Sequence, residues 1–161
     1  MKKLIFTLLI ITAFTNNSFS ASTGSDYSTG TSDYSKAYNL IKAAKKYEKK
    51  GKTEKAQKRY AKAQKLLLKS NEIKPLQADT LNYLGFTTRK LGDYIKGEEF
   101  YLQGLQIEPN HNGINEYLGE LYIATNRMDM AKERLEILKI CNCEEYEVLK
   151  EIIEGTKKSK Y

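Results

Sequence analysis

The sequence has no tryptophan, only two prolines and two cysteines, and a single histidine. So little proline argues against a many-stranded β-sandwich, because the turns of such a fold need proline and glycine. One histidine and two cysteines are too few ligands for a typical zinc site. No serine or cysteine has a histidine and a carboxylate at a catalytic spacing, and no glycine-rich phosphate loop is present. We therefore expect no catalytic residues, no metal and no cofactor.

A long apolar run is also missing after residue 20, so we expect no transmembrane span in the processed chain. The 161 residues are 40% hydrophobic and 29% charged, which fits one ordinary soluble domain and is too apolar for a wholly disordered chain. Abundant Lys, Glu, Leu, Ala and Ile favour helices. The composition therefore predicts an all-α protein.

The first 20 residues have the order of a secretory signal. Lys2 and Lys3 precede an apolar stretch over residues 4–14, and Ser18 and Ser20 flank Phe19 just before the expected cleavage site. Cleavage after Ser20 would send the protein to the periplasm or outside the cell, whereas an uncleaved N-terminal anchor is the alternative. Residues 21–35 are rich in Ser, Thr and Gly and predict a flexible linker.

An internal repeat dominates the rest of the chain. Leu81-x-x-Leu84-Gly85 returns 34 residues later as Asn115-x-x-Leu118-Gly119. The same pattern recurs upstream at an offset of 41, which pairs Gly51 with Gly92 and Tyr60 with Tyr101. The difference of one heptad nearly preserves the helical register, so we expect a longer second helix in the first unit, from about Thr53 to Ile73.

Small residues occupy equivalent places in the units, as two helices that cross closely require. They stand at Ala44, Gly85 and Gly119 on the first helices and at Ala56, Gly97 and Ala131 on the second helices. Each unit therefore reads as a hairpin of two amphipathic helices, stacked on its neighbour.

The pattern resembles the tetratricopeptide repeat, which places Leu-Gly and then Tyr on one helix and Ala and then Phe or Tyr on the next. Matches include Leu84, Gly85 and Tyr101 in the middle unit, although no unit has the leading Trp and Asn115 stands at an expected apolar position. The resemblance implies an α-α superhelix over residues 36–155. Its expected parts are repeats at about 37–77, 78–111 and 112–143, a capping helix at 144–154 and a Lys-rich tail at 156–161.

More narrowly, Glu116-Tyr117-Leu118-Gly119-Glu120-Leu121-Tyr122 is similar to a segment of small exported bacterial tetratricopeptide-repeat proteins. This similarity favours a periplasmic location and implies no particular activity.

In stacked hairpins the first helices line a groove, and residues three or four apart on them face the same way. We expect binding residues at Asn82, Phe86, Arg89, Lys90, Glu116 and Glu120, in a lining that also includes Tyr38, Ile41, Lys45, Glu48, Asp79 and Ile123. This lining suits an extended peptide or a partner helix. Capture of a C-terminal carboxylate is not expected, because unit three presents Gly113 and acidic residues. For Phe86, packing beneath the neighbouring unit is the alternative.

Basic residues concentrate in the first hairpin, where residues 36–69 contain thirteen Lys or Arg but two Glu. A basic patch is expected at Lys45, Lys49, Lys52, Lys55, Lys58 and Lys62. Such a patch would attract anionic lipid or polysaccharide, in a salt-dependent manner. These lysines could equally be solvated helix faces. Nucleic acid is disfavoured because export separates the chain from it and the aromatics follow the packing period.

Cys141 and Cys143 are separated by one residue. In an exported protein they could form a local disulfide, remain as thiols or pair with another molecule, or take part in thiol exchange. His111 follows Pro109-Asn110 and is expected in a turn between units.

The leading prediction is a periplasmic scaffold, not an enzyme, that binds a protein or peptide through its groove. The alternative is an envelope-associated protein that binds anionic lipid or polysaccharide through its first hairpin.

Overall fold

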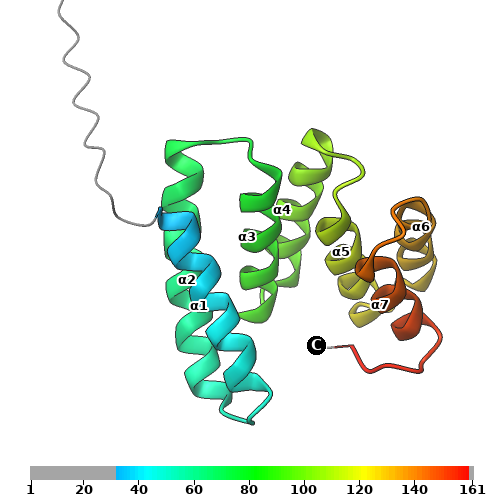
Figure 1. Ribbon diagram of the computed structural model, residues 1–161, viewed down its shortest axis with the longest axis horizontal. Coiled ribbons are helices and arrows are strands. Elements are labelled where there is room, and N and C mark those ends of the chain that lie inside the picture. The colour runs from blue at the N-terminus through cyan, green and yellow to red at the C-terminus, as the bar shows by residue number, and fades with distance from the viewer. Residues whose placement is uncertain (1–31, 160–161) are drawn as a thin grey trace, which may run out of the picture.

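The computed structural model describes residues 32–159, which form seven α-helices and no strand. Six helices pair into three successive hairpins and the seventh packs on the last hairpin (Figure 1). The predicted all-α superhelix is confirmed. The helices are α1 (Asp33–Glu48), α2 (Thr53–Ile73), α3 (Ala78–Lys90), α4 (Tyr94–Ile107), α5 (Asn112–Ala124), α6 (Met128–Leu138) and α7 (Glu144–Ile153).

The first helix begins slightly earlier than the sequence suggested. The Ser32 side chain accepts a hydrogen bond from the Ser35 backbone N–H at 3.1 Å and thereby caps α1. Residues 33–35, expected in the flexible linker, are therefore helical. The predicted signal peptide and the remainder of the linker lie outside the described residues.

The second helix of the first hairpin runs from Thr53 to Ile73, as the extra heptad predicted. Its 21 residues span about 30 Å at 1.5 Å per residue. Figure 1 shows the turn between α1 and α2 extending beyond the turns of the neighbouring hairpins.

The hairpin turns repeat with the same period as the helices. Gly51 and Gly92 close the first two turns with φ angles of +67° and +99°, where a side chain would be strained. In the third hairpin, Asn126 stands 34 residues after Gly92 and takes a φ of +59°. Asn adopts this left-handed conformation more readily than most residues, so the turn is retained without glycine.

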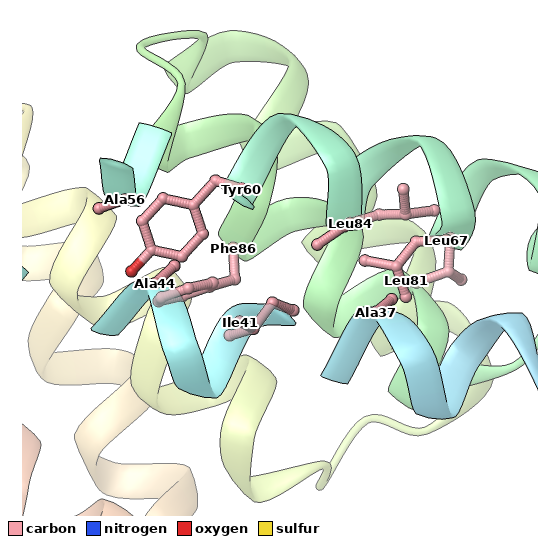
Figure 2. Packing of buried hydrophobic residues seen from close by; sticks show 10 residues of the cluster. Ala37, Ile41, Ala44, Ala56, Tyr60, Leu67, Leu81, Leu84 and Phe86 are labelled. Atoms are coloured by element: carbon pink, nitrogen blue, oxygen red, sulfur yellow. The ribbon is translucent and has the colours of Figure 1, made fainter. Parts of the chain in front are cut away.

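The first core joins all of α1, α2 and α3 (Figure 2). Ala37, Ile41 and Ala44 of α1 face Ala56, Tyr60 and Leu67 of α2, and α3 adds Leu81, Leu84 and Phe86. A second core gathers residues of α3 to α6, including Ala78, Tyr101, Ile114, Leu118 and Ala131. Leu84 and Leu118, which the repeat aligns, are both fully buried in these equivalent positions.

The small residues of the repeat stand where helices touch. A Cβ atom added to Gly85 would lie 2.5 Å from the Tyr101 ring, and one added to Gly119 would lie 2.6 Å from Leu149 Cδ2. The polar residue at the expected apolar position is also explained. The buried Asn115 amide donates to the carbonyl oxygens of Pro109 and His111 and so holds the connection between α4 and α5.

Between α6 and α7, Cys141 and Cys143 are joined by a disulfide. This is the local bridge among the three alternatives that the sequence allowed, and the described residues include no free cysteine. None of the described helices has the length and apolar character that a bilayer crossing requires.

Candidate binding site

The face on which the sequence predicted a groove is largely interior. Of 13 residues in α3, ten are buried, and α5 buries eight of its 13. Both helices are covered because each packs against its own hairpin partner and against a neighbouring hairpin. Most residues predicted to bind a ligand therefore have structural contacts instead.

Phe86 is a core residue. Of the two roles predicted for it, packing beneath the neighbouring hairpin is the one that the structure shows, and not ligand contact in the groove. Its exposed fraction is 2%, and its ring centroid lies 5.7 Å from that of Tyr60 and 5.0 Å from that of Tyr117. The ammonium of Lys45 lies 4.5 Å from the Phe86 ring centroid. Since Phe86 fills the space between the first and third hairpins, it is not available to a ligand.

Near Phe86, three cationic side chains form contacts between hairpins. Arg89 is 2% exposed and donates from Nη1 to the carbonyl oxygen of Tyr117 at 2.6 Å. Lys45 Nζ donates to Tyr117 Oη at 2.9 Å, and Lys90 Nζ lies 2.7 Å from Glu48 Oε1. Arg89 and Lys90, both predicted to line the groove, therefore make contacts that hold the hairpins together. Lys45, predicted both in the groove lining and in the basic patch, lies at this junction.

The buried tyrosines at this junction remain protonated. Burial is the main cause that raises the pKa of Tyr117, and Glu116 raises it further. Burial likewise raises the pKa of Tyr101, while Arg89 lowers it only in part. Neutral phenols suit this region, because a tyrosinate here would lie near the carboxylates of Glu116 and Glu120.

An open pocket remains where the beginnings of α3 and α5 meet the start of α7. Its volume is about 380 Å³, and a second hollow of about 230 Å³ shares Glu116, Tyr117 and Glu145 with it. We call the combined surface the acidic strip. The pocket is lined by Asp79, Asn82, Tyr83, Glu108, Asn110, His111, Asn112, Gly113, Glu116, Tyr117 and Glu145, and the hollow adds Lys45, Glu144 and Val148.

Asn82 is the buried polar group of this pocket. It is 5% exposed, and none of the described residues donates a hydrogen bond to its Oδ1. A buried acceptor without a donor costs about 1–3 kcal/mol, which a ligand or water that donates there would remove. Gly113 makes room for this amide, since a Cβ at residue 113 would lie 2.8 Å from Asn82 Nδ2.

His111 has two contacts that the sequence did not reveal. Its Nδ1 accepts the Ile114 backbone N–H at 3.2 Å and caps α5. Its Nε2 lies 3.2 Å from Asp79 Oδ1, which is on α3. Because Nδ1 accepts, the proton of the neutral ring belongs on Nε2, where it is donated to Asp79. His111 thus links the beginnings of two helices at the pocket.

Tyrosines extend the pocket wall toward α1. The Tyr83 ring lines the pocket and lies 6.0 Å from the Tyr34 ring and 5.5 Å from the Tyr38 ring, between centroids. Burial raises the pKa of Tyr83 to about 12. The Tyr83 phenol therefore stays neutral, and the three rings add an aromatic edge to an otherwise acidic surface.

The structure brings Asn82 and Glu116 of the predicted groove together in the pocket. It excludes Phe86 and the fully buried Glu120 from the pocket lining. The sequence analysis missed Tyr83, Glu108 and Glu145 as pocket residues. Tyr83 could have been found from its place one residue after Asn82, but Glu145 lies on the capping helix, whose approach to α5 no local pattern indicates.

The basic residues of the first hairpin lie elsewhere. Lys49, Lys52, Lys55, Lys58 and Lys62 are exposed. A separate hollow of about 380 Å³ lies between α1 and α2 and shares no residue with the acidic strip. Its lining is Ala43, Lys46, Tyr47, Lys50, Lys52 and Arg59. The Arg59 guanidinium lies 4.3 Å from the centroid of the Tyr47 ring and is thereby held at this hollow.

No other site chemistry is evident in residues 32–159. No group of three or more His, Cys, Asp or Glu side chains there is arranged to hold a metal ion. The paired cysteines and the scattered carboxylates form no nucleophile–base arrangement with His111, which caps a helix.

Comparison with known proteins supports the fold. Residues 78–111 match the family model of the tetratricopeptide repeat. No curated protein sequence matches the chain at a significant level. The match covers the middle hairpin, α3 and α4, which is therefore a tetratricopeptide repeat.

Several solved structures have the same helical arrangement. The type III secretion translocator chaperone SycD of Yersinia enterocolitica superposes with a TM-score of 0.53 at 16% identity, over 73% of this chain and 81% of that chain. A chain of the CopN-Scc3 complex gives a TM-score of 0.50 at 18% identity, over 83% and 80%. The first tetratricopeptide domain of Spaghetti, bound to an HSP90 peptide, gives 0.48 at 19% identity, over 78% and 95%. At these identities the likeness to SycD and to the chain of the CopN-Scc3 complex shows the fold alone.

The core position of Phe86 leads to a stability prediction. Phe86→Ala should lower the free energy of unfolding by about 3–5 kcal/mol, because it removes a buried ring between two hairpins. Urea unfolding of the full chain measures this loss. Tyr94→Ala, at an aromatic residue that is 37% exposed, is the control and should cost much less. Wild-type stability in Phe86→Ala would contradict the core assignment.

Proposed function

We propose that this chain, a helical array with the tetratricopeptide fold, is a scaffold that binds an extended segment of another protein along the acidic strip. The observation that carries the proposal is the pocket of about 380 Å³, in which the buried Asn82 Oδ1 has no donor among the described residues. A segment with N–H donors or a cationic side chain would supply the missing hydrogen bond. The role involves binding without a catalytic step.

The surroundings of the pocket favour a polypeptide over a compact ligand. The pocket continues into the second hollow through Glu116, Tyr117 and Glu145, so the surface is elongated. Its wall combines carboxylates, amides and the Tyr83 ring, which suit main-chain and side-chain recognition. A carboxylate-terminated guest is disfavoured, since Asp79, Glu108 and Glu145 would repel it.

The scaffold is also rigid before it binds. Arg89 and Lys45 tie Tyr117 to α3 and α1, and His111 ties α5 to Asp79. A prearranged receptor loses little conformational freedom on binding, so more of the contact energy appears as affinity. SycD, to which this chain is similar in fold, is a translocator chaperone, and that role is compatible with protein binding by this fold.

A random-peptide display selection tests this proposal. Peptides selected on the full chain should lose affinity about tenfold or more when Asp79→Asn and Glu145→Gln are combined, because both residues line the pocket. Glu133→Gln together with Asp129→Asn, on α6, is the matched control with the same change in charge. Selected peptides that ignore the pocket pair, or that respond equally to the control, would refute the acidic strip as the binding site.

The periplasm is the proposed location. The support is the sequence order of residues 1–20, with Lys2 and Lys3 before an apolar stretch and serines near residue 20. N-terminal sequencing of the protein exported by a Gram-negative host should begin at Ala21. A sequence that begins at Met1 in the membrane fraction would instead support the uncleaved anchor.

A second candidate function is association with an anionic envelope surface of lipid or polysaccharide. The observation that favours it is the hollow lined by Lys46, Lys50, Lys52 and Arg59, in a hairpin with few acidic residues. These charges are largely solvated, so each contributes modestly, and the interaction would be screened over about 8 Å at physiological salt.

Co-sedimentation with vesicles that contain anionic lipid tests this second function. Lys46→Gln, Lys50→Gln and Lys52→Gln together should reduce binding several-fold at low salt, and raising the salt should abolish it. Lys132→Gln on α6, Lys139→Gln at its C-cap and Lys150→Gln on α7 remove the same charge and should have less effect. Equal losses in the two triple variants would attribute binding to net charge and contradict a defined basic hollow.

A further inference from the structure

The chain after α7 turns back toward α5 (Figure 1). Gly155, with a φ of +75°, ends the helix, and the backbone N–H groups of Thr156 and Lys157 both donate to the carbonyl oxygen of Glu151. Lys157 Nζ lies 2.8 Å from Glu151 Oε2. The tail therefore leaves α7 in a defined direction.

The tail then reaches the helix that forms the middle of the acidic strip. Ser159 Oγ donates a hydrogen bond to Glu120 Oε2 at 3.2 Å, although 39 residues separate them in sequence. Glu120 lies one helical turn after Glu116, which lines both hollows of the strip. The tail is thus seated beside the end of the strip.

The charges of the two surfaces are complementary. The last six residues, Thr-Lys-Lys-Ser-Lys-Tyr, carry three lysines and no acidic side chain. The strip contains five carboxylates and one lysine, which are Asp79, Glu108, Glu116, Glu144, Glu145 and Lys45. The hydrogen bond to Glu151 is the main cause that raises the pKa of Lys157, and Glu144 and Glu116 raise it further, so the tail lies within the field of the strip.

We propose that the acidic strip accepts a lysine-bearing extended segment, and that the chain's own C-terminal tail competes with that segment from within the molecule. This inference rests on the proposed function, because it names the class of guest for the same site. Charge complementarity favours a lysine-bearing ligand. The tail, which lies beside the end of the strip, is an example of such a segment.

Contacts described for the tail include the hydrogen bond from Ser159 to Glu120 and the exposed ion pair between Lys157 and Glu151. Contacts of these kinds contribute little each, so the tail is a weak competitor. However, a short tether gives an effective concentration on the order of millimolar, so even weak contacts occupy a site for much of the time. A partner segment with more contacts would displace the tail.

Fluorescence polarisation with a labelled synthetic peptide, Thr-Lys-Lys-Ser-Lys-Tyr, tests both parts on the full chain. The peptide should bind, and its counterpart with glutamine in place of each lysine should not. The variant Lys157→Gln with Lys158→Gln should bind the lysine peptide about 2–10-fold more tightly, because the internal competitor is weakened. Lys132→Gln on α6 with Lys139→Gln at its C-cap removes the same charge and should leave the affinity near that of the wild type.

Equal affinity of the wild type and the tail variant, or an equal gain in the α6 control, would overturn the internal competition. Equal binding of the lysine and glutamine peptides would overturn the assigned class of guest. Neither result removes the proposed function, provided that displayed peptides still depend on Asp79 and Glu145. If displayed peptides of every charge class ignore those residues, the proposed function itself fails.

Discussion

Helix α3, the first helix of the middle hairpin, is buried on two sides. The arrangement of the other helices depends on this burial. Its side toward α1 and α2 requires Leu81, Leu84 and Phe86, and its side toward α4 requires a glycine at residue 85, because the Tyr101 ring occupies the place of a Cβ. A helix enclosed in this way can expose only its edges. The beginning of α3, with Asp79 and Asn82, is such an edge, and the binding pocket forms there.

Charged residues perform two separate tasks in this array. Near the junction of α1, α3 and α5, Lys45 and Arg89 donate to the hydroxyl and carbonyl groups of Tyr117, so charge serves the relative position of the hairpins. At the beginnings of α3, α5 and α7, carboxylates face an open pocket. The two roles differ in burial. A buried cation must keep its protein partners, whereas an exposed carboxylate can exchange bound water for a ligand.

The repeating architecture was predictable from the sequence because each hairpin must hide an apolar side at a fixed period. The helix Thr53–Ile73 and the small residues at Gly85 and Gly119 followed from that period. The lining of the site was predictable only in part. A helical spacing of three or four residues shows that Asn82, Phe86 and Arg89 share a side of α3, but it does not show how deeply the next hairpin covers that side. The cap by His111, the approach of Glu145 and the return of the tail depend on tertiary contacts between distant segments.

The acidic strip as the recognition surface is tested most directly by NMR chemical-shift mapping of the full chain as a selected peptide is added. The account predicts that the largest shifts cluster at residues 78–83, 110–117 and 144–148, with smaller shifts at 156–159 as the tail is displaced. Shifts confined to the outer residues of α1 and α2, with the beginnings of α3 and α5 unchanged, would contradict it.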